Sequence, residues 1–115
     1  MALTELECKR YERDLAKFLE RRRPPPHIRP KLDIGYKVSG QSIEVVEIRP
    51  DWQDPKVHRE HPVARATFVR TKNRWRVFWM KRDLKWHAYE PVPEVASLEA
   101  FLNVVDRDEF CCFFG

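Results

Sequence analysis

The sequence is poor in glycine: its three glycines are at positions 35, 40 and 115. A glycine-rich phosphate-binding loop needs several glycines close together, so loops of this kind are excluded. Cysteine is equally scarce: two of the three cysteines are adjacent, which makes no disulfide framework and fits a reducing compartment. The sequence has neither a CxxC pair nor an HExxH motif, so it predicts no metal site, no cofactor and no catalytic residue.

Long apolar runs are also missing, so nothing in the 115 residues has the length needed to cross a bilayer. The first residues, MALTELECKRYERD, mix acidic and basic side chains and do not resemble a signal peptide. We therefore expect a cytoplasmic protein without membrane contact. This length and composition predict a single domain, residues 1–115, with an ordinary buried core.

The most informative stretch runs from Ala64 to Tyr89 and alternates as three consecutive strands. Tight turns are predicted at Lys72-Asn73 and at Arg82-Asp83. The first turn would set Phe68 opposite Val77, and the second would set Trp79 opposite Trp86. One face then carries the predicted core set: Ala66, Phe68, Val77, Trp79, Trp86 and Ala88.

The opposite face of these strands is predicted to mix cations with flat aromatic rings. Its candidate binding residues are Arg65, Arg76, Phe78, Lys85, His87 and Tyr89. Such a face suits base stacking and phosphate contacts. If a helix or the C-terminal tail covers Phe78, however, the same residues are core with basic chains at its edge. The sequence leaves both interpretations open.

The rest of the chain predicts a helix at each end. Thr4 and Glu7 form a capping box ahead of an apolar stripe, and Ser97 is the expected N-cap of the second helix. Three prolines at 24–26 end the first helix and open a connector, 23–31, that is expected to be extended.

A hairpin turn is predicted at residues 39–42, a polar loop at 51–61 and a covered apolar tail at 110–114. The predicted fold is α+β: an antiparallel meander sheet of about five strands, with an N-terminal helix and a C-terminal helix plus apolar tail.

Charge is distributed unevenly around a net value of +4. Residues 56–87 contain ten Lys/Arg and two Asp/Glu, whereas residues 88–115 contain one and six. This pattern predicts a bipolar surface, unless the fold brings the two blocks together and neutralises them.

Five stretches of the chain are distinctive: RRRPPPHIR (21–29), LDIGY (32–36), GQSIEVVEIRPDWQDP (40–55), VFWMKRDLKWHAYEP (77–91) and CFFG (112–115). Together they resemble the uncharacterised bacterial family known as the domain of unknown function number three-zero-two-four, over nearly the whole chain. The resemblance implies a bacterial cytoplasmic domain and assigns no activity and no functional residue.

Three functions fit these patterns. The first is a small non-enzymatic binding module whose basic-aromatic face contacts nucleic acid. The second is a protein-interaction or regulatory module that associates with a partner or with itself through an exposed sheet edge. The third is a metal-dependent nuclease, because Asp51, Asp83 and Lys85 resemble a scattered PD…(D/E)xK signature.

Overall fold

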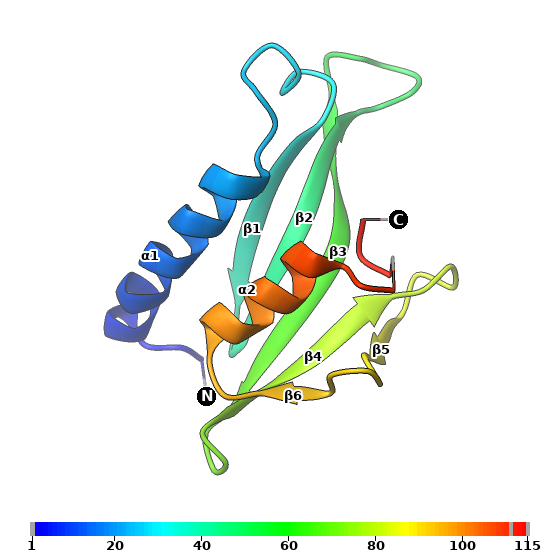
Figure 1. Cartoon of the computed structure of the whole chain (residues 1–115). Coiled ribbons are helices and arrows are strands. Elements are labelled where there is room, and N and C mark those ends of the chain that lie inside the picture. The colour runs from blue at the N-terminus through cyan, green and yellow to red at the C-terminus, as the bar shows by residue number, and fades with distance from the viewer. Residues whose placement is uncertain (1, 111, 115) are drawn as a thin grey trace.

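The chain folds into a twisted antiparallel sheet with two helices (Figure 1). The computed structural model describes residues 2–110 and 112–114. In chain order the elements are α1 (Glu5–Arg22), β1 (Asp33–Ser39), β2 (Ser42–Pro50), β3 (His58–Val69), β4 (Arg74–Met80), β5 (Trp86–Ala88), β6 (Glu94–Val95) and α2 (Leu98–Arg107). The strand order is β1-β2-β3-β4-β5, and the short β6 pairs with β4. The predicted α+β fold with an antiparallel meander and two terminal helices is confirmed.

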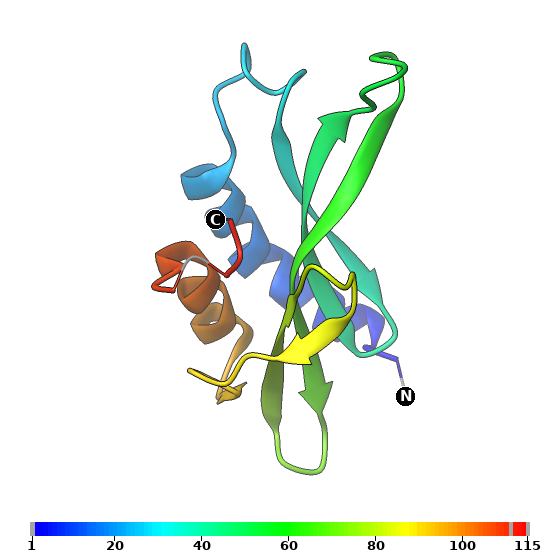
Figure 2. The same cartoon turned by 90° about the vertical axis from the view of Figure 1, so that its right-hand side faces the viewer.

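Both helices lie on the same face of the sheet (Figures 1 and 2). Figure 2 shows α1 and α2 together on one side of the strands, and within the described residues no helix covers the other side. We call this second side the open face. Its central side chains, on β3, β4 and β5, are Arg65, Thr67, Arg76, Phe78, Met80 and Trp86.

The side of the sheet that faces the helices has small residues at its centre, with larger ones such as Phe68 and Trp75 toward one end. Ala64, Ala66 and Val77 are each 0% exposed at its centre, and the helices supply the large side chains Phe18 and Phe101, at 1% and 0%. Small sheet residues let the helices approach closely, and the large helical side chains then fill the layer at the density of a protein interior. The predicted burial of Ala66 and Val77 is confirmed.

Side chains at the N-cap positions terminate both helices at their N-terminal ends. The Thr4 hydroxyl accepts a hydrogen bond from the Glu7 N–H at 3.1 Å, and the Glu7 carboxylate accepts one from the Thr4 N–H at 2.9 Å. These two bonds complete the predicted capping box. At α2, Ser97 Oγ accepts from the Ala100 N–H at 3.1 Å, which confirms the predicted N-cap.

The β1–β2 turn forms as predicted, with Gly40 at a positive φ of 59°. The β3–β4 hairpin differs from the prediction by two residues, because Phe68 pairs with Trp75 and Ala66 with Val77. The connecting loop is residues 70–73 rather than a turn at Lys72-Asn73. An even shift leaves every side chain on its predicted face, so the core assignment survives this error.

The β2–β3 hairpin continues past both helices as an arm, residues 46–62 (Figure 1). The predicted polar loop at 51–61 is too long: the loop is residues 51–57, because strand pairing continues as far as Pro50 opposite His58. A register shift between Val45 and Val46 marks the base of the arm, with Val46 opposite Pro62. Proline within a sheet is confined mostly to bulges and free edges, and this position is next to a bulge.

The connector between α1 and β1 is turned rather than extended. The Ile28 N–H donates to the Pro25 carbonyl at 2.9 Å, since a proline carbonyl still accepts although its nitrogen cannot donate. Arg23 closes the same segment by donating two hydrogen bonds of 2.8 Å to the Asp33 carboxylate. The predicted extended connector is therefore wrong.

The apolar tail docks through an aspartate at the end of α2. Asp108 has a φ of 42°, and its carboxylate accepts from the Phe113 N–H at 2.9 Å. The Phe113 ring lies 4.8 Å from the Tyr89 ring and is 6% exposed, so the tail is covered there as predicted. Phe110 is 59% exposed, and Cys111 lies outside the described residues.

An ion pair attaches α1 to the β3–β4 hairpin. Arg70 donates to both Glu7 carboxylate oxygens, at 2.8 and 3.1 Å, and to the Ala2 carbonyl at 3.0 Å. The bonds from Arg70, followed by the bond from the Thr4 backbone, lower the pKa of Glu7 from 4.5 to about 2.

Replacing Phe101 with alanine should lower the free energy of unfolding by about 3–5 kcal/mol, because it leaves a cavity in the layer between helices and sheet. Denaturant unfolding followed by circular dichroism measures the change. Phe110→Ala is the matched control: the same atoms are removed from an exposed ring, and the change should stay within about 0.5 kcal/mol. Equal losses in the two variants would contradict this core.

The Glu7–Arg70 pair should make stability depend on pH. A carboxyl whose pKa is lower in the folded than in the unfolded state stabilises the fold above the unfolded value and loses that contribution as pH falls through the folded value. Wild type should therefore melt at a higher temperature than Glu7→Gln near neutral pH. The difference should shrink between about pH 5 and pH 2. A difference that does not change with pH would show that the pair does not form.

Candidate nucleic-acid interface

The open face draws its side chains from alternating positions on neighbouring strands. Arg65 on β3 lies opposite Phe78 on β4, and both alternate with the buried residues Ala64, Ala66 and Val77. Because successive side chains of a strand point to opposite faces, Arg65 and Phe78 point away from the helices. Phe78 is half-buried, and its covering comes from neighbours in the sheet.

The β4–β5 hairpin is one residue out of the predicted register. Trp79 pairs with His87 rather than with Trp86. The loop has three residues, 82–84, because Leu84 adopts a left-handed φ of 61° after the turn, as three-residue hairpin loops commonly do. An odd shift moves side chains to the other face, so the predicted Trp79–Trp86 pair does not form and Trp86 joins the open face.

Three of the six predicted binding residues, Arg65, Arg76 and Phe78, lie together on the open face. Lys85 is exposed at the end of the β4–β5 hairpin, opposite Lys81 and next to Trp86 in the chain, so alternation does not place it on the open face. Ala88, predicted in the core, is exposed opposite Phe78. The structure thus brings half of the candidate set together and adds Trp86, which the sequence prediction placed inside.

His87 and Tyr89 lie on the other side of the sheet, and their predicted face is wrong because of the register shift. His87 Nε2 is 2.8 Å from Asp83 Oδ2, and this hydrogen bond is the largest cause of the lowered pKa of Asp83. Tyr89 is 2% exposed, and burial raises the pKa of its phenol.

Two arginines lie over two aromatic rings on the open face. The Arg76 guanidinium carbon is 5.3 Å from the centroid of Phe78, and that of Arg65 is 5.9 Å from the centroid of Trp86. Both distances fall within the reach of cation–π attraction, about 6 Å. The face therefore alternates positive charge with flat apolar surface.

Hydroxyl groups position Arg65 from the neighbouring strands. Its Nη2 donates to Ser42 Oγ at 3.0 Å, and Ser42 Oγ lies 2.8 Å from Thr67 Oγ1. The Arg65 Nε is buried and has no hydrogen-bond partner among the described residues. Glu44 lies opposite Arg65 on β2, so a carboxylate bounds this face on the β2 side.

The β4–β5 hairpin adds cations at this end of the sheet. Arg82 and Lys85 are exposed there, the Lys81 Nζ lies 5.3 Å from the ring centroid of Trp79 on the other side, and Asp83 is engaged by His87. The face is therefore most basic toward β4 and β5.

No sequence signal placed the Trp86 ring on the open face. A left-handed loop position is usually marked by glycine or asparagine, and here it is occupied by Leu84, which is 80% exposed. Counting a three-residue loop as an alternative to the two-residue turn would have placed Trp86 correctly.

The carboxylates of the nuclease hypothesis lie on separate loops. Asp51 follows β2 and accepts a 2.8 Å hydrogen bond from Arg59, while Asp83 belongs to the β4–β5 hairpin (Figure 1). Over residues 2–110 and 112–114, no three metal-binding side chains come together. The geometry gives the nuclease hypothesis no site.

A family model described as Domain of unknown function (DUF3024) matches residues 3–115. The chain belongs to this family. Since the description of DUF3024 states no activity, any function has to be inferred from the geometry of the site. No curated protein and no solved structure matches the chain. In the part of the chain that the structure describes, no helix is long and apolar enough to cross a membrane.

The observed register predicts that His87 controls the ionisation of Asp83. In His87→Ala, the pKa of Asp83 should rise toward its usual 3.8, because the hydrogen bond that stabilises the carboxylate is lost. Titration of the side-chain carboxyl signal by NMR measures this shift. His61→Ala, which changes a histidine on the arm, should leave Asp83 unchanged. An unchanged Asp83 in His87→Ala would argue for the other register.

Proposed function

We propose that this DUF3024 chain is a cytoplasmic, non-enzymatic binding module that contacts single-stranded nucleic acid through the open face. The observation that supports this most is the pairing of Arg65 with Trp86 and of Arg76 with Phe78 on a face without a helix. Alternating rings and guanidinium groups offer stacking surfaces for bases and donors for the phosphates between them.

A single strand fits this face better than a duplex. Unpaired bases can turn their flat faces toward Phe78 and Trp86, whereas a duplex keeps its bases stacked on one another. The Arg76 side chain is exposed beside Phe78, so its N–H groups can still donate hydrogen bonds to a ligand. A phosphate oxygen accepts such bonds from arginine.

The charges favour nucleic-acid binding toward β4 and β5 rather than toward β2. Glu44 repels phosphates on the β2 side, while Arg76 on the face and the exposed cations Arg82 and Lys85 of the β4–β5 hairpin attract them at the other end. With a net charge of only +4 the long-range attraction is modest. The local cations and rings therefore have to supply most of the affinity, with little selectivity for sequence.

Binding of fluorescently labelled single-stranded DNA and RNA, followed by anisotropy, should weaken steeply as salt rises. Arg76→Ala with Lys85→Ala should reduce the slope of log affinity against log salt by roughly one to two units, because up to two phosphate contacts are lost. Phe78→Leu should cost roughly 1–3 kcal/mol of stacking while leaving that slope unchanged.

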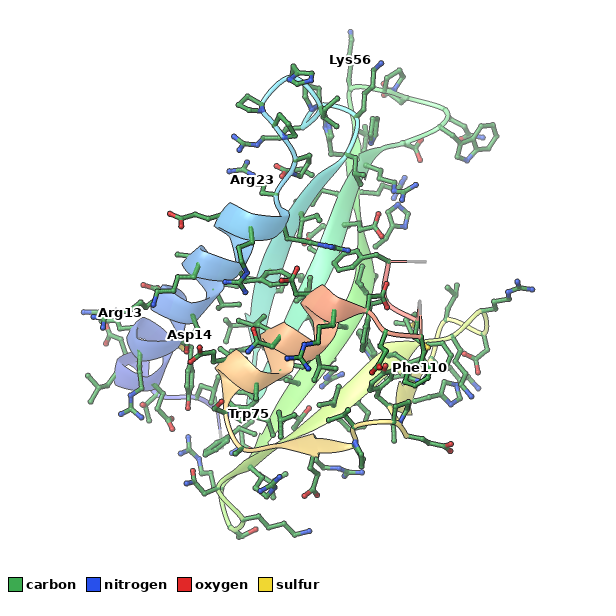
Figure 3. The ribbon with its side chains drawn as sticks, in the orientation of Figure 1. Arg13, Asp14, Arg23, Lys56, Trp75 and Phe110 are labelled. Carbon is green, nitrogen blue, oxygen red and sulfur yellow. The ribbon has the colours of Figure 1, made fainter. Side chains whose placement is uncertain are left out.

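The matched control is Arg10→Ala with Arg13→Ala, which removes the same charge from exposed positions on α1 (Figure 3 labels Arg13). Because α1 lies on the other side of the sheet, this variant should keep the wild-type salt slope. Affinity that ignores salt, or equal losses in the two double variants, would exclude the open face as the binding surface.

A further inference from the structure

The arm carries a tryptophan that the fold leaves in solvent. Trp52 is 87% exposed in the loop between β2 and β3, and Val57 in the same loop is 43% exposed. Figure 3 shows the labelled Lys56 of this loop at the far end of the molecule, beyond both helices. Tryptophan exposed to this degree is unusual, and this residue type is enriched among those that dominate protein interfaces.

The loop around Trp52 is held in one conformation by Asp51. The Asp51 Oδ2 accepts from the Gln53 and Asp54 N–H groups at 3.3 and 3.2 Å, and its Oδ1 accepts from Arg59 Nε at 2.8 Å. The Asp51 N–H donates to the Val57 carbonyl at 2.7 Å, which closes the loop. These bonds, Arg59 first, hold the pKa of Asp51 below its usual range. An ordered loop that exposes an indole loses less entropy on binding than a flexible one.

Two ion pairs beside Trp52 turn their positive members outward. The Arg49 side chain is 54% exposed and its partner Glu47 only 14%, at 2.6 Å. The Arg59 side chain is 63% exposed and its partner Asp51 again 14%, at 2.8 Å. Each guanidinium keeps N–H groups that these contacts do not use, so a partner reaching this surface meets donors and positive charge before it meets the carboxylates.

A hollow of about 440 Å³ lies between these groups, lined by Arg49, Pro50, Asp51, Trp52, Arg59 and His61. Its size is within the range of small binding clefts. Its lining combines an indole face, two arginines and carboxylate oxygens, so it can receive both hydrogen-bond acceptors and donors. Tryptophan and arginine together are the residue types most enriched at interface hot spots.

We propose that the arm is a docking site for an acidic peptide segment of another protein, which packs an apolar side chain against Trp52 and pairs its carboxylates with Arg49 and Arg59. A peptide suits the hollow better than nucleic acid does. Its backbone N–H groups can donate to the Asp51 carboxylate, which lines the hollow and is 14% exposed, whereas a phosphodiester has no N–H group to donate. The arm and the open face are separate surfaces, so this proposal does not depend on nucleic-acid binding.

The test uses the full chain and short synthetic peptides that carry one leucine or phenylalanine among aspartates and glutamates. The four tryptophans give four indole N–H signals in a proton–nitrogen correlation spectrum, and Trp52→Phe identifies the signal of Trp52 by its disappearance. Acidic peptides should shift this signal. Versions with asparagine and glutamine in place of the acids, or with lysine, should not.

Variants then separate docking from general charge attraction. Trp52→Ala should weaken the binding of acidic peptides at least about tenfold, as loss of a hot-spot tryptophan does. Asp51→Asn should weaken it less, because the indole remains while the loop loses order. Leu6→Ala is the matched control. It removes a different exposed apolar side chain, 71% exposed and on α1, so this variant should bind acidic peptides as wild type does.

Several results would overturn the proposal. One is acidic peptides that leave the Trp52 signal unmoved, and another is equal affinity for Trp52→Ala and wild type. If the asparagine and glutamine peptides shifted the Trp52 signal as much as the acidic ones, Arg49 and Arg59 would have no role in binding. A Trp52 signal that moves with single-stranded oligonucleotides but not with peptides would assign the arm to nucleic acid. One that moves only with the concentration of the chain itself would assign it to a second copy.

Discussion

The burial of two helices against one face of a single sheet is the constraint on which the rest of this structure depends. Each helix has one apolar stripe: α1 packs against β1 and α2, while α2 packs against β3, β4 and β6, where Ala64, Ala66 and Val77 are fully buried. The other face must then tolerate water. It does so by covering Phe78 and Trp86 partly with the guanidinium groups of Arg76 and Arg65 instead of with a third layer. The features that support ligand binding there follow from this sidedness.

The helices and strands were predicted well from the sequence, and two of the hairpin turns were predicted poorly. Whether the resulting shift in strand pairing was even or odd decided if side chains stayed on their predicted face. At β3–β4 the pairing moved by two residues, so Phe68 and Val77 stayed in the core. At β4–β5 it moved by one, so Trp86 and His87 exchanged faces. The second error has a physical origin: a leucine at a left-handed position is unfavourable locally and is kept by the surrounding pairing. Half of the candidate site followed from alternation alone, and the rest depended on a loop whose length the residues do not indicate.

Residues 58–61 of the arm were predicted as loop because they have the composition of a free strand edge. From His58 to Pro62, β3 pairs with β2, while β4 pairs only from Ala64 onward. Charged side chains and proline are what proteins place on free strand edges, since they discourage pairing with other chains. The sequence HREHP, residues 58–62, therefore resembles a loop in composition although these residues form part of β3. Val46, at 1% exposure on the open face, is the apolar residue that fixes the base of the arm.

In several ion pairs the arginine is more exposed than its carboxylate partner, and this changes the surface potential in a way that the net charge does not show. The pair of Arg23, 41% exposed, and Asp33, 17% exposed, repeats the arrangement seen twice on the arm. Each such pair is neutral at a distance but forms a dipole whose positive end points into the solvent. A molecule within a Debye length, about 10 Å at moderate salt, experiences a more basic surface than +4 suggests. The chain can therefore repel other copies of itself weakly at long range and still attract acidic groups strongly once they are in contact.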